Sequence, residues 1–180
     1  NWSLNAERAG YYRALATEVP IWESPGIFTW AYGGQQIGAS EDGSVLTLTS
    51  TTQAYKWSRN SQYPDWTFSY PTGGAAFSRV SRDGSTIAAA GNGILYWLDA
   101  ATGETLWTAA FSEPARLQGI SLSTDDSIVA VTVYDSCMVY EDGDRRGAVP
   151  IGTTSSGTQY AAALSGDGEL LVTGDFFGAL

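Results

Sequence analysis

The sequence has no histidine, one cysteine, one methionine and a single lysine among its 180 residues. Without an imidazole, the chain cannot supply a Ser-His-Asp or Cys-His nucleophile pair, a histidine-ligated haem or a histidine-containing zinc site. Its one cysteine, Cys137, cannot form an internal disulfide or a cysteine-rich metal cage, and its apolar neighbours indicate a small buried side chain. We therefore predict no catalytic, cofactor-binding or metal-ligating residue and expect no cofactor. The pattern leans away from an enzyme.

Basic residues are scarce, with 9 Lys+Arg against 19 Asp+Glu and a formal net charge of -10. A nucleic-acid binder needs a basic face that displaces counterions from phosphate, so this class of partner is not expected. Long apolar runs are also missing, so no segment is predicted to span a membrane. Only Lys56 of the basic residues is a lysine, while Ser, Thr, Gly and aromatic residues abound. This composition favours an extracytoplasmic or cell-surface location, where Asn1 would be a glycosylation acceptor.

A repeat is the most informative feature that is present. Four segments follow the pattern Ser-x-Asp-Gly, with the last residue replaced by Asp in the third, and they recur every 41 to 42 residues. Asp can bond the following backbone and Gly tolerates positive φ, so each segment predicts a tight turn. The four turns are expected at residues 40–43, 81–84, 123–126 and 165–168.

Short apolar runs flank each turn at the same offset, and paired runs around a turn predict β-hairpins. The first strand of each hairpin is rich in small residues, which suits a place where strands converge. The expected first strands are 36–39, 77–80, 119–122 and 161–164, and the second strands are 45–48, 86–89, 128–131 and 170–173. Two further strands follow in each of the first three units, at 53–57 and 66–70, 93–98 and 104–109, and 137–140 and 147–151.

Four strands in each repeat of this length are typical of a β-propeller blade. The predicted fold is therefore all-β, a β-propeller of four-stranded antiparallel blades with a period of 41–42 residues. About four blades are expected in this chain. A two-sheet sandwich also uses many short strands, but it does not account for the repeated turn.

Residues 97–107 read Trp-Leu-Asp-Ala-Ala-Thr-Gly-Glu-Thr-Leu-Trp. This segment resembles the tryptophan-docking repeat of pyrroloquinoline-quinone-type propellers at Asp99, Thr102, Gly103 and Trp107, while Trp97 replaces the family's Ala. The Ser-x-Asp-Gly turn also resembles that of WD-repeat-like propellers. The similarities cover residues 36–180. From the residues themselves we expect Thr102-Gly103 to form an outer hairpin turn, Asp99 to bond backbone there, and Trp107 to pack against the next blade.

The last repeat has too few residues after its turn for four strands, so the last blade is expected to be incomplete. We divide the chain into a lead segment, 1–18, and propeller blades, 19–180. Residues 19–23 and 27–32 resemble third and fourth strands, and they either complete the last blade and close a four-bladed ring or belong to an earlier blade. We favour the second reading, a window of a larger propeller. Residues 6–17 fit either an amphipathic helix or a strand.

Acidic clusters have structural explanations in this scheme. Residues 141–144, Glu-Asp-Gly-Asp, lack the distal ligands of a calcium loop and are expected to form a solvated hairpin turn. Asp42, Asp83, Asp125 and Asp167 recur at one position of the turn, which favours a backbone role over a functional ring.

Aromatic residues divide into two groups. Four tryptophans at repeat positions are expected to pack between or within blades: Trp57, Trp66, Trp97 and Trp107. The better candidates for a contact surface are Tyr11, Tyr12, Trp22, Trp30 and Tyr32, which fall outside the clearest repeats.

Three functions are compatible with these features. The leading hypothesis is a non-catalytic scaffold or protein-interaction module whose rigid blades hold partner-binding loops. The resemblance implies an alternative, a fragment of a quinone-cofactor dehydrogenase that binds a calcium-associated quinone. A third possibility is self-association, in which open blade edges pair with another copy in a fibre or oligomer.

Overall fold

The structure is a computed structural model that describes residues 37–59, 61, 63–70, 76–111, 117–133, 136–151 and 161–174. All regular structure in these ranges is β-strand. The strands form three four-stranded sheets and one two-stranded sheet, and every strand pair is antiparallel. Each sheet is made from consecutive strands, as a propeller blade requires.

Each of the three complete sheets is one repeat of the sequence. The first blade holds β1 (Ile37–Ala39), β2 (Val45–Thr49), β3 (Gln53–Ser58) and β4 (Trp66–Ser69). The second holds β5 (Ala76–Val80), β6 (Thr86–Gly91), β7 (Ile94–Asp99) and β8 (Thr105–Ala110). The third holds β9 (Gly119–Leu122), β10 (Ile128–Thr132), β11 (Ser136–Glu141) and β12 (Asp144–Pro150), and the last hairpin holds β13 (Ala161–Leu164) and β14 (Leu171–Gly174).

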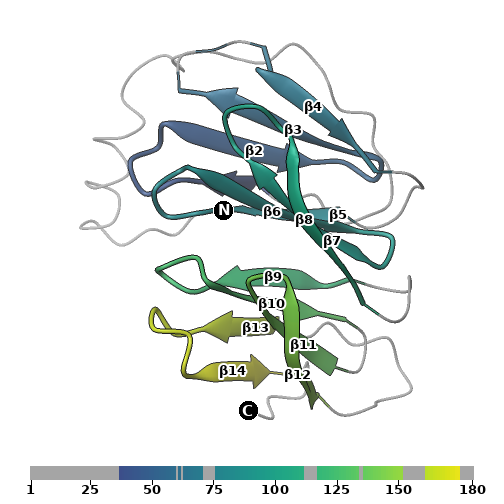
Figure 1. The fold of residues 1–180 in the computed structure, drawn as a ribbon. Helices are drawn as coiled ribbons and strands as arrows, with labels where there is room; N and C mark the ends of the chain where they lie inside the picture. Colours follow the sequence, from purple (N-terminus) through teal and green to yellow (C-terminus); the bar gives the residue numbers. More distant parts are fainter. Residues whose placement is uncertain are drawn as a thin grey trace, which may run out of the picture.

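The sheets pack on one another in chain order (Figure 1). The inner strand β5 contacts β1 and β2 of the first blade and β9 of the third, and β13 in turn contacts β9 and β10. Together with the repeat of 41 to 42 residues, this arrangement confirms the predicted β-propeller blades. Within the described residues, the first blade and the last hairpin lie at the two ends of the row.

The second strands of the middle blades are buried on both faces. Strands β6 and β10 are buried at every position after their first residue. Because each lies between two strands of its own sheet and between two neighbouring sheets, its residues are almost continuously apolar. The sequence prediction for these two strands is confirmed.

Small residues are needed where the inner strands converge. A Cβ added to Gly38 in β1 would lie 2.7 Å from Oγ1 of Thr47 and 3.4 Å from Cγ2 of Val80 in the next blade. Side-chain atoms cannot approach that closely, so the inner strand has no room for a larger residue at this position.

Two faces of each blade make the contacts between blades. We call the face toward the next blade in the chain the forward face, and the opposite one the backward face. The forward face of the first blade meets the backward face of the second through Phe68, Tyr70 and Tyr96, whose rings lie 4.9 to 6.0 Å apart. A second apolar cluster joins the second and third blades. Leu95 and Trp97 of the second blade and Val129 and Met138 of the third belong to it. The core therefore lies between blades rather than within one.

Some predictions fall outside the described residues. These are the segments 6–17, 19–23 and 27–32, and the aromatic residues Tyr11, Tyr12, Trp22, Trp30 and Tyr32. The division at residue 18 stays a prediction for the same reason. Among the described residues, no helix has the length and apolar character needed to cross a membrane.

Candidate functional site

One end of the blades carries nearly all of the distinctive polar chemistry of the described residues. We call it the turn end, because every blade places its first-to-second and third-to-fourth strand hairpins there. Backbone hydrogen bonds hold the two hairpins of a blade side by side, from Arg59 N to Ser44 O (2.9 Å) in the first and from Ala100 N to Ser85 O (2.9 Å) in the second. The turn end is therefore a rigid platform, suited to hold exposed side chains in fixed positions.

The repeated tetrad builds this platform through one hydrogen-bond network. In the second blade, Ser81 Oγ donates to Asp83 Oδ1 (2.8 Å) and accepts from Thr86 N (2.9 Å). Asp83 Oδ1 also accepts from Ser85 N (2.8 Å). The same three bonds recur in the other turns, around Ser40 and Asp42, Ser123 and Asp125, and Ser165 and Asp167.

These bonds hold the turn aspartates in the ionised form. The backbone N–H of Ser44 and the hydroxyl of Ser40 lower the pKa of Asp42 from 3.8 to about 2. Similar hydrogen bonds lower the pKa values of Asp83, Asp125 and Asp167. Each of the four carboxylates is committed to its own turn, which supports the backbone role that the sequence predicted.

Asp126 departs from the pattern and was not singled out from the sequence. It occupies the fourth position of its turn, where the other three turns have Gly, and has φ 62°. Its Oδ1 accepts a hydrogen bond from Arg82 N (3.3 Å) in the preceding blade. Burial raises the pKa of this carboxyl, so Asp126 is a strained and partly desolvated group between the second and third blades.

The outer hairpins dock tryptophans from the preceding blade. Asp99 Oδ1 accepts hydrogen bonds from Ala101 N (2.9 Å) and Thr102 N (2.7 Å), and Gly103 has φ 76°, as predicted for this corner. The ring of Trp66 covers this turn so closely that a Cβ on Gly103 would lie 2.9 Å from it.

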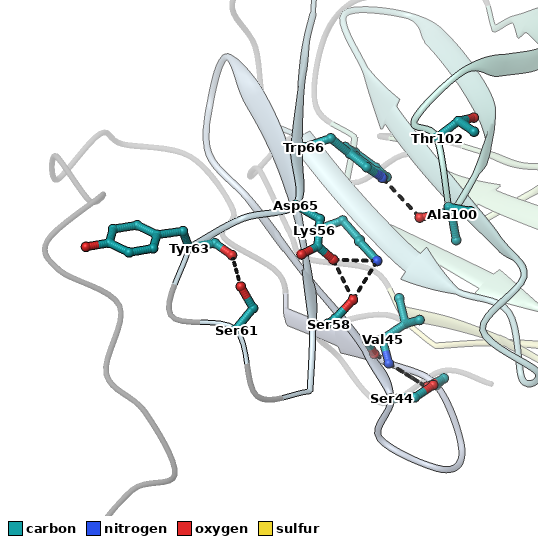
Figure 2. Close-up of polar contacts among 12 residues, drawn as sticks. Ser44, Val45, Lys56, Ser58, Ser61, Tyr63, Asp65, Trp66, Ala100 and Thr102 are labelled. Atoms are coloured by element: carbon teal, nitrogen blue, oxygen red, sulfur yellow. Dashed lines mark hydrogen bonds and ion pairs between the residues drawn. The ribbon is translucent and has the colours of Figure 1, made fainter.

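The indole Nε1 of Trp66 also donates to Ala100 O (3.0 Å) in the same turn (Figure 2). Trp107 covers Gly143 in the third blade in the same way, where a Cβ would lie 3.3 Å from the ring. The predicted contact of Trp107 with the next blade is confirmed, as is the turn at residues 141–144. The predicted burial of Trp57 and Trp97 is confirmed as well.

A partly buried ion pair supports the outer hairpin of the first blade (Figure 2). Lys56 Nζ lies 2.6 Å from Asp65 Oδ2 and donates to Ser58 Oγ (3.0 Å), while Ser58 Oγ donates to Asp65 Oδ2 (2.6 Å). Burial opposes ionisation of Asp65, but the bonds from Lys56 and Ser58 outweigh it, so its pKa is lowered. Tyr63, which lies between Lys56 and Asp65 in the sequence, points away from the sheet and is exposed.

Charge is segregated along the blades. Every carboxylate and every basic side chain of the described residues lies in a turn at this end or in the strand residues next to it. The described residues of the opposite end carry no charge. The turn end is therefore the acidic part of what the structure describes.

Four exposed carboxylates at the turn end have no hydrogen-bond or ion-pair partner among the described residues: Glu104, Asp142, Asp144 and Glu169. Other carboxylates are paired, with Glu41 to Arg82 in the next blade and Glu141 to Arg146 in its own hairpin. The unpaired group differs from the turn aspartates, because its charge is available to an outside ligand.

Two hollows open near the turn end. One, of about 310 Å³, lies between the second and third blades and is lined by Arg79, Arg82, Ser123 and Asp126 among others. The other, of about 630 Å³, lies along the first blade beside Ser44, Ser58 and Arg59. Both are shallow and open, unlike the enclosed pockets that take small-molecule cofactors.

The chemistry of catalysis and metal binding has few candidates in this part of the chain. No group of three or more His, Cys, Asp or Glu in the described residues could hold a metal ion. Cys137 is fully buried, as predicted, and burial raises the pKa of its thiol, which disfavours the reactive thiolate.

The residues that the sequence did not predict are those that join one blade to the next. They are Glu41 with Arg82, and Asp126 with the backbone of Arg82; the ion pair of Lys56 with Asp65, within the first blade, was not predicted either. Only Asp126 had a visible signal, since it replaces the Gly that the other three tetrads share.

Comparison with known proteins adds information on the fold alone. No protein-family model matches the chain, and no curated protein matches it. Among solved structures 814 chains match, which shows how widespread the fold is. One belongs to a crystal structure of a mitotic checkpoint complex, with a TM-score of 0.64 and 17% sequence identity. The match covers 76% of this chain but only 44% of the other, so this chain spans less than half of that neighbour.

The blades, their order and this likeness define the class. The described residues are β-propeller blades that resemble WD-repeat-like propellers in their turns and sheet layout. The likeness at 17% identity carries no function to this chain.

Proposed function

We propose that this chain is a non-catalytic propeller scaffold that binds another protein at its turn end, and that the partner segment is basic. The observation that carries the proposal is the segregation of charge: a rigid platform presents the unpaired carboxylates of Glu104, Asp142, Asp144 and Glu169. Complementary charge steers association and fixes the orientation of a partner. The occurrence of a structural neighbour in a multi-protein complex supports this class of function.

The division of labour among the carboxylates also supports a binding role. The turn aspartates are held by serine hydroxyls and backbone N–H groups, so the platform keeps its shape without help from a ligand. The unpaired carboxylates stand on the second and third blades and on the last hairpin. The platform would therefore lose little conformational freedom when a partner contacts several blades at once.

Calorimetric titration of the chain with two unstructured peptides of equal length tests the proposal. One peptide is rich in lysine and the other in glutamate. The lysine-rich peptide should bind, and its affinity should fall as salt is raised. A variant with E104Q, D142N, D144N and E169Q should bind it at least tenfold more weakly. The matched control alters the same number of uncharged residues at the opposite end, with S50A, T52A, N92A and S136A, and should bind normally. Equal binding of the two peptides, or normal binding by the neutralised variant, would contradict the proposal.

The docking of Trp66 and Trp107 on the turns of the next blades favours a second candidate, a fragment of a quinone-cofactor dehydrogenase. Addition of pyrroloquinoline quinone with calcium, followed by absorbance of the chain after gel filtration, tests it. Retained cofactor absorbance would favour the dehydrogenase, and its absence would favour the scaffold. An extracytoplasmic or cell-surface location remains part of the proposal, supported by the single lysine of this acidic chain.

A further inference from the structure

The two ends of the row of blades expose surfaces that the middle of the row buries. At one end, Val172 on the last hairpin is 56% exposed, while the same repeat position is 1% exposed in Thr47 and 0% exposed in Ala88 and Ala130. At the other end, Ile37 on the first blade is 72% exposed, while its equivalents Ser78 and Ile120 are 0% and 4% exposed. Val172 lies on a forward face and Ile37 on a backward face, so the exposed surfaces are the two halves of one kind of interface.

The contacts within the row show how these halves fit. In two of the three blade contacts, the first residue after the turn network packs on the turn glycine of the next blade: Val45 Cγ2 would lie 3.2 Å from a Cβ on Gly84, and Ile128 Cδ1 would lie 2.5 Å from one on Gly168. Leu170 holds this position in the last hairpin and is 66% exposed. Gly43 holds the receiving position in the first blade, and a Cβ there would meet nothing within 4 Å.

A backbone hydrogen bond accompanies this contact between turns. Glu41 N donates to Arg82 O (3.0 Å) across the first and second blades, and Thr124 N donates to Gly166 O (2.7 Å) across the third blade and the last hairpin. Each bond runs forward from the second residue of one turn to the same residue of the next. If the same bond formed between the last turn of one copy and the first turn of another, the N–H of Gly166 would donate to the carbonyl of Glu41.

The open surfaces are limited to the inner strands. In the first blade, Ile37 is exposed and Leu46 and Leu48 are half-buried, whereas Tyr55 and Trp57 on β3 are buried. The last hairpin presents the inner strands β13 and β14. In every blade pair of the row, inner strands contact inner strands. The two open surfaces therefore involve the same strands that meet in those pairs.

We propose that a second copy of this chain covers both ends, with Leu170 and Val172 of each copy packed against the first blade of the other. One copy alone offers both halves of the interface, which a partner of different sequence would have to reproduce by coincidence. Such a contact joins unlike surfaces, so it closes into a ring only if the rotation fits and otherwise gives a fibre. We infer a dimer closed head to tail, in which each copy covers both open surfaces of the other.

Sedimentation velocity over a range of concentrations tests the dimer. The chain should shift from 19.1 kDa to twice that mass as its concentration rises. The variants I37D and V172D should each stay monomeric at concentrations where the unaltered chain is dimeric, and L170D provides a second forward-face variant should V172D not fold. The matched control is L106D, whose residue is 54% exposed on the outer strand β8, and it should dimerise normally.

Mixing the variants tests the pairing of unlike surfaces. An I37D copy keeps its forward face and a V172D copy keeps its backward face, so an equimolar mixture should form a dimer through one intact contact, more weakly than the unaltered chain. If the unaltered chain is a monomer at every concentration, the proposal is overturned. Residues 1–36 or another protein would then be the candidates to cover these surfaces. Failure of the mixture to associate while the unaltered chain dimerises would also overturn it, because a symmetric interface would then be at work.

Discussion

The same position of the repeat behaves differently in the middle of the row and at its end. Ala88 on β6 is fully buried, while Val172 on β14, at the equivalent position, is 56% exposed although its side chain is the larger and more apolar one. The difference comes from the neighbour: Ala88 has the third blade against it, and Val172 has no further blade among the described residues. Burial in this fold is therefore a property of blade pairs rather than of single blades, as in other repeat architectures.

A charge placed at each of these two positions should give the largest contrast. Ala88→Asp buries a carboxylate without a partner and should lower the free energy of unfolding by about 3–5 kcal/mol. Val172→Asp should change it by less than about 0.5 kcal/mol, because the new charge stays in water. Urea unfolding at a concentration where the chain is monomeric measures both. Equal losses would mean that Val172 is packed against something in the single chain.

The tryptophan contact between blades should give the next largest effect. Trp107→Ala removes a ring that stacks on Trp97, with centroids 5.2 Å apart, and covers Gly143 of the next blade. Because the ring is half-buried, the loss should be about 2–3 kcal/mol, below the ~3–5 kcal/mol of a fully buried aromatic. The matched change Leu106→Ala, one residue away and exposed, should cost less than about 0.5 kcal/mol. A similar loss for both variants would show that the docking adds nothing to stability.

The turn serine should matter more in the middle of the row than at its end. Ser81→Ala removes a fully buried hydroxyl that bonds Thr86 N and Asp83 Oδ1. The free energy of unfolding should fall by about 1–2 kcal/mol. Ser165→Ala removes the same bonds where water can replace the hydroxyl, so its cost should be smaller. Thermal unfolding followed by circular dichroism measures the pair. A greater loss at Ser165 would reverse the ranking.

The one non-glycine tetrad offers the smallest effect and the only expected gain. Asp126→Gly restores the residue of the other three turns, relieves a φ of 62° and removes a partly desolvated carboxyl, at the loss of one 3.3 Å bond from Arg82 N. Stability should rise by up to about 1 kcal/mol at neutral pH. Gly84→Asp, the reverse change one blade earlier, is the control and should lower the melting temperature. A loss of stability in Asp126→Gly would mean that the bond to Arg82 outweighs the strain.

The blades were predictable because local chemistry defines them. The Ser and Asp of each tetrad form their bonds within a few residues, so the turns at residues 40–43 and 81–84 could be read from the sequence, and the strands followed from the apolar runs beside them. Trp107 could be assigned to a contact between blades because Trp66 holds the same position of the repeat, 41 residues earlier.

The candidate site was less predictable, because it depends on which residues of different blades meet. The pairing of Glu41 with Arg82 crosses from one blade to the next, and neither residue recurs at that position of the repeat. The gathering of all described charges at one end also follows only when the antiparallel topology is known. Exposure at Val172 and Ile37 could not be predicted at all, since their repeat position suggests burial.

Amide hydrogen exchange of the unaltered chain at low and high concentration tests most directly whether blade pairs determine burial. At low concentration, β6 and β10 should exchange slowly, while the amides of β1 and β14 should exchange quickly. At high concentration, β1 and β14 should become protected together, and the outer strand β8 should not change. Protection of β14 equal to that of β6 at both concentrations would contradict the account.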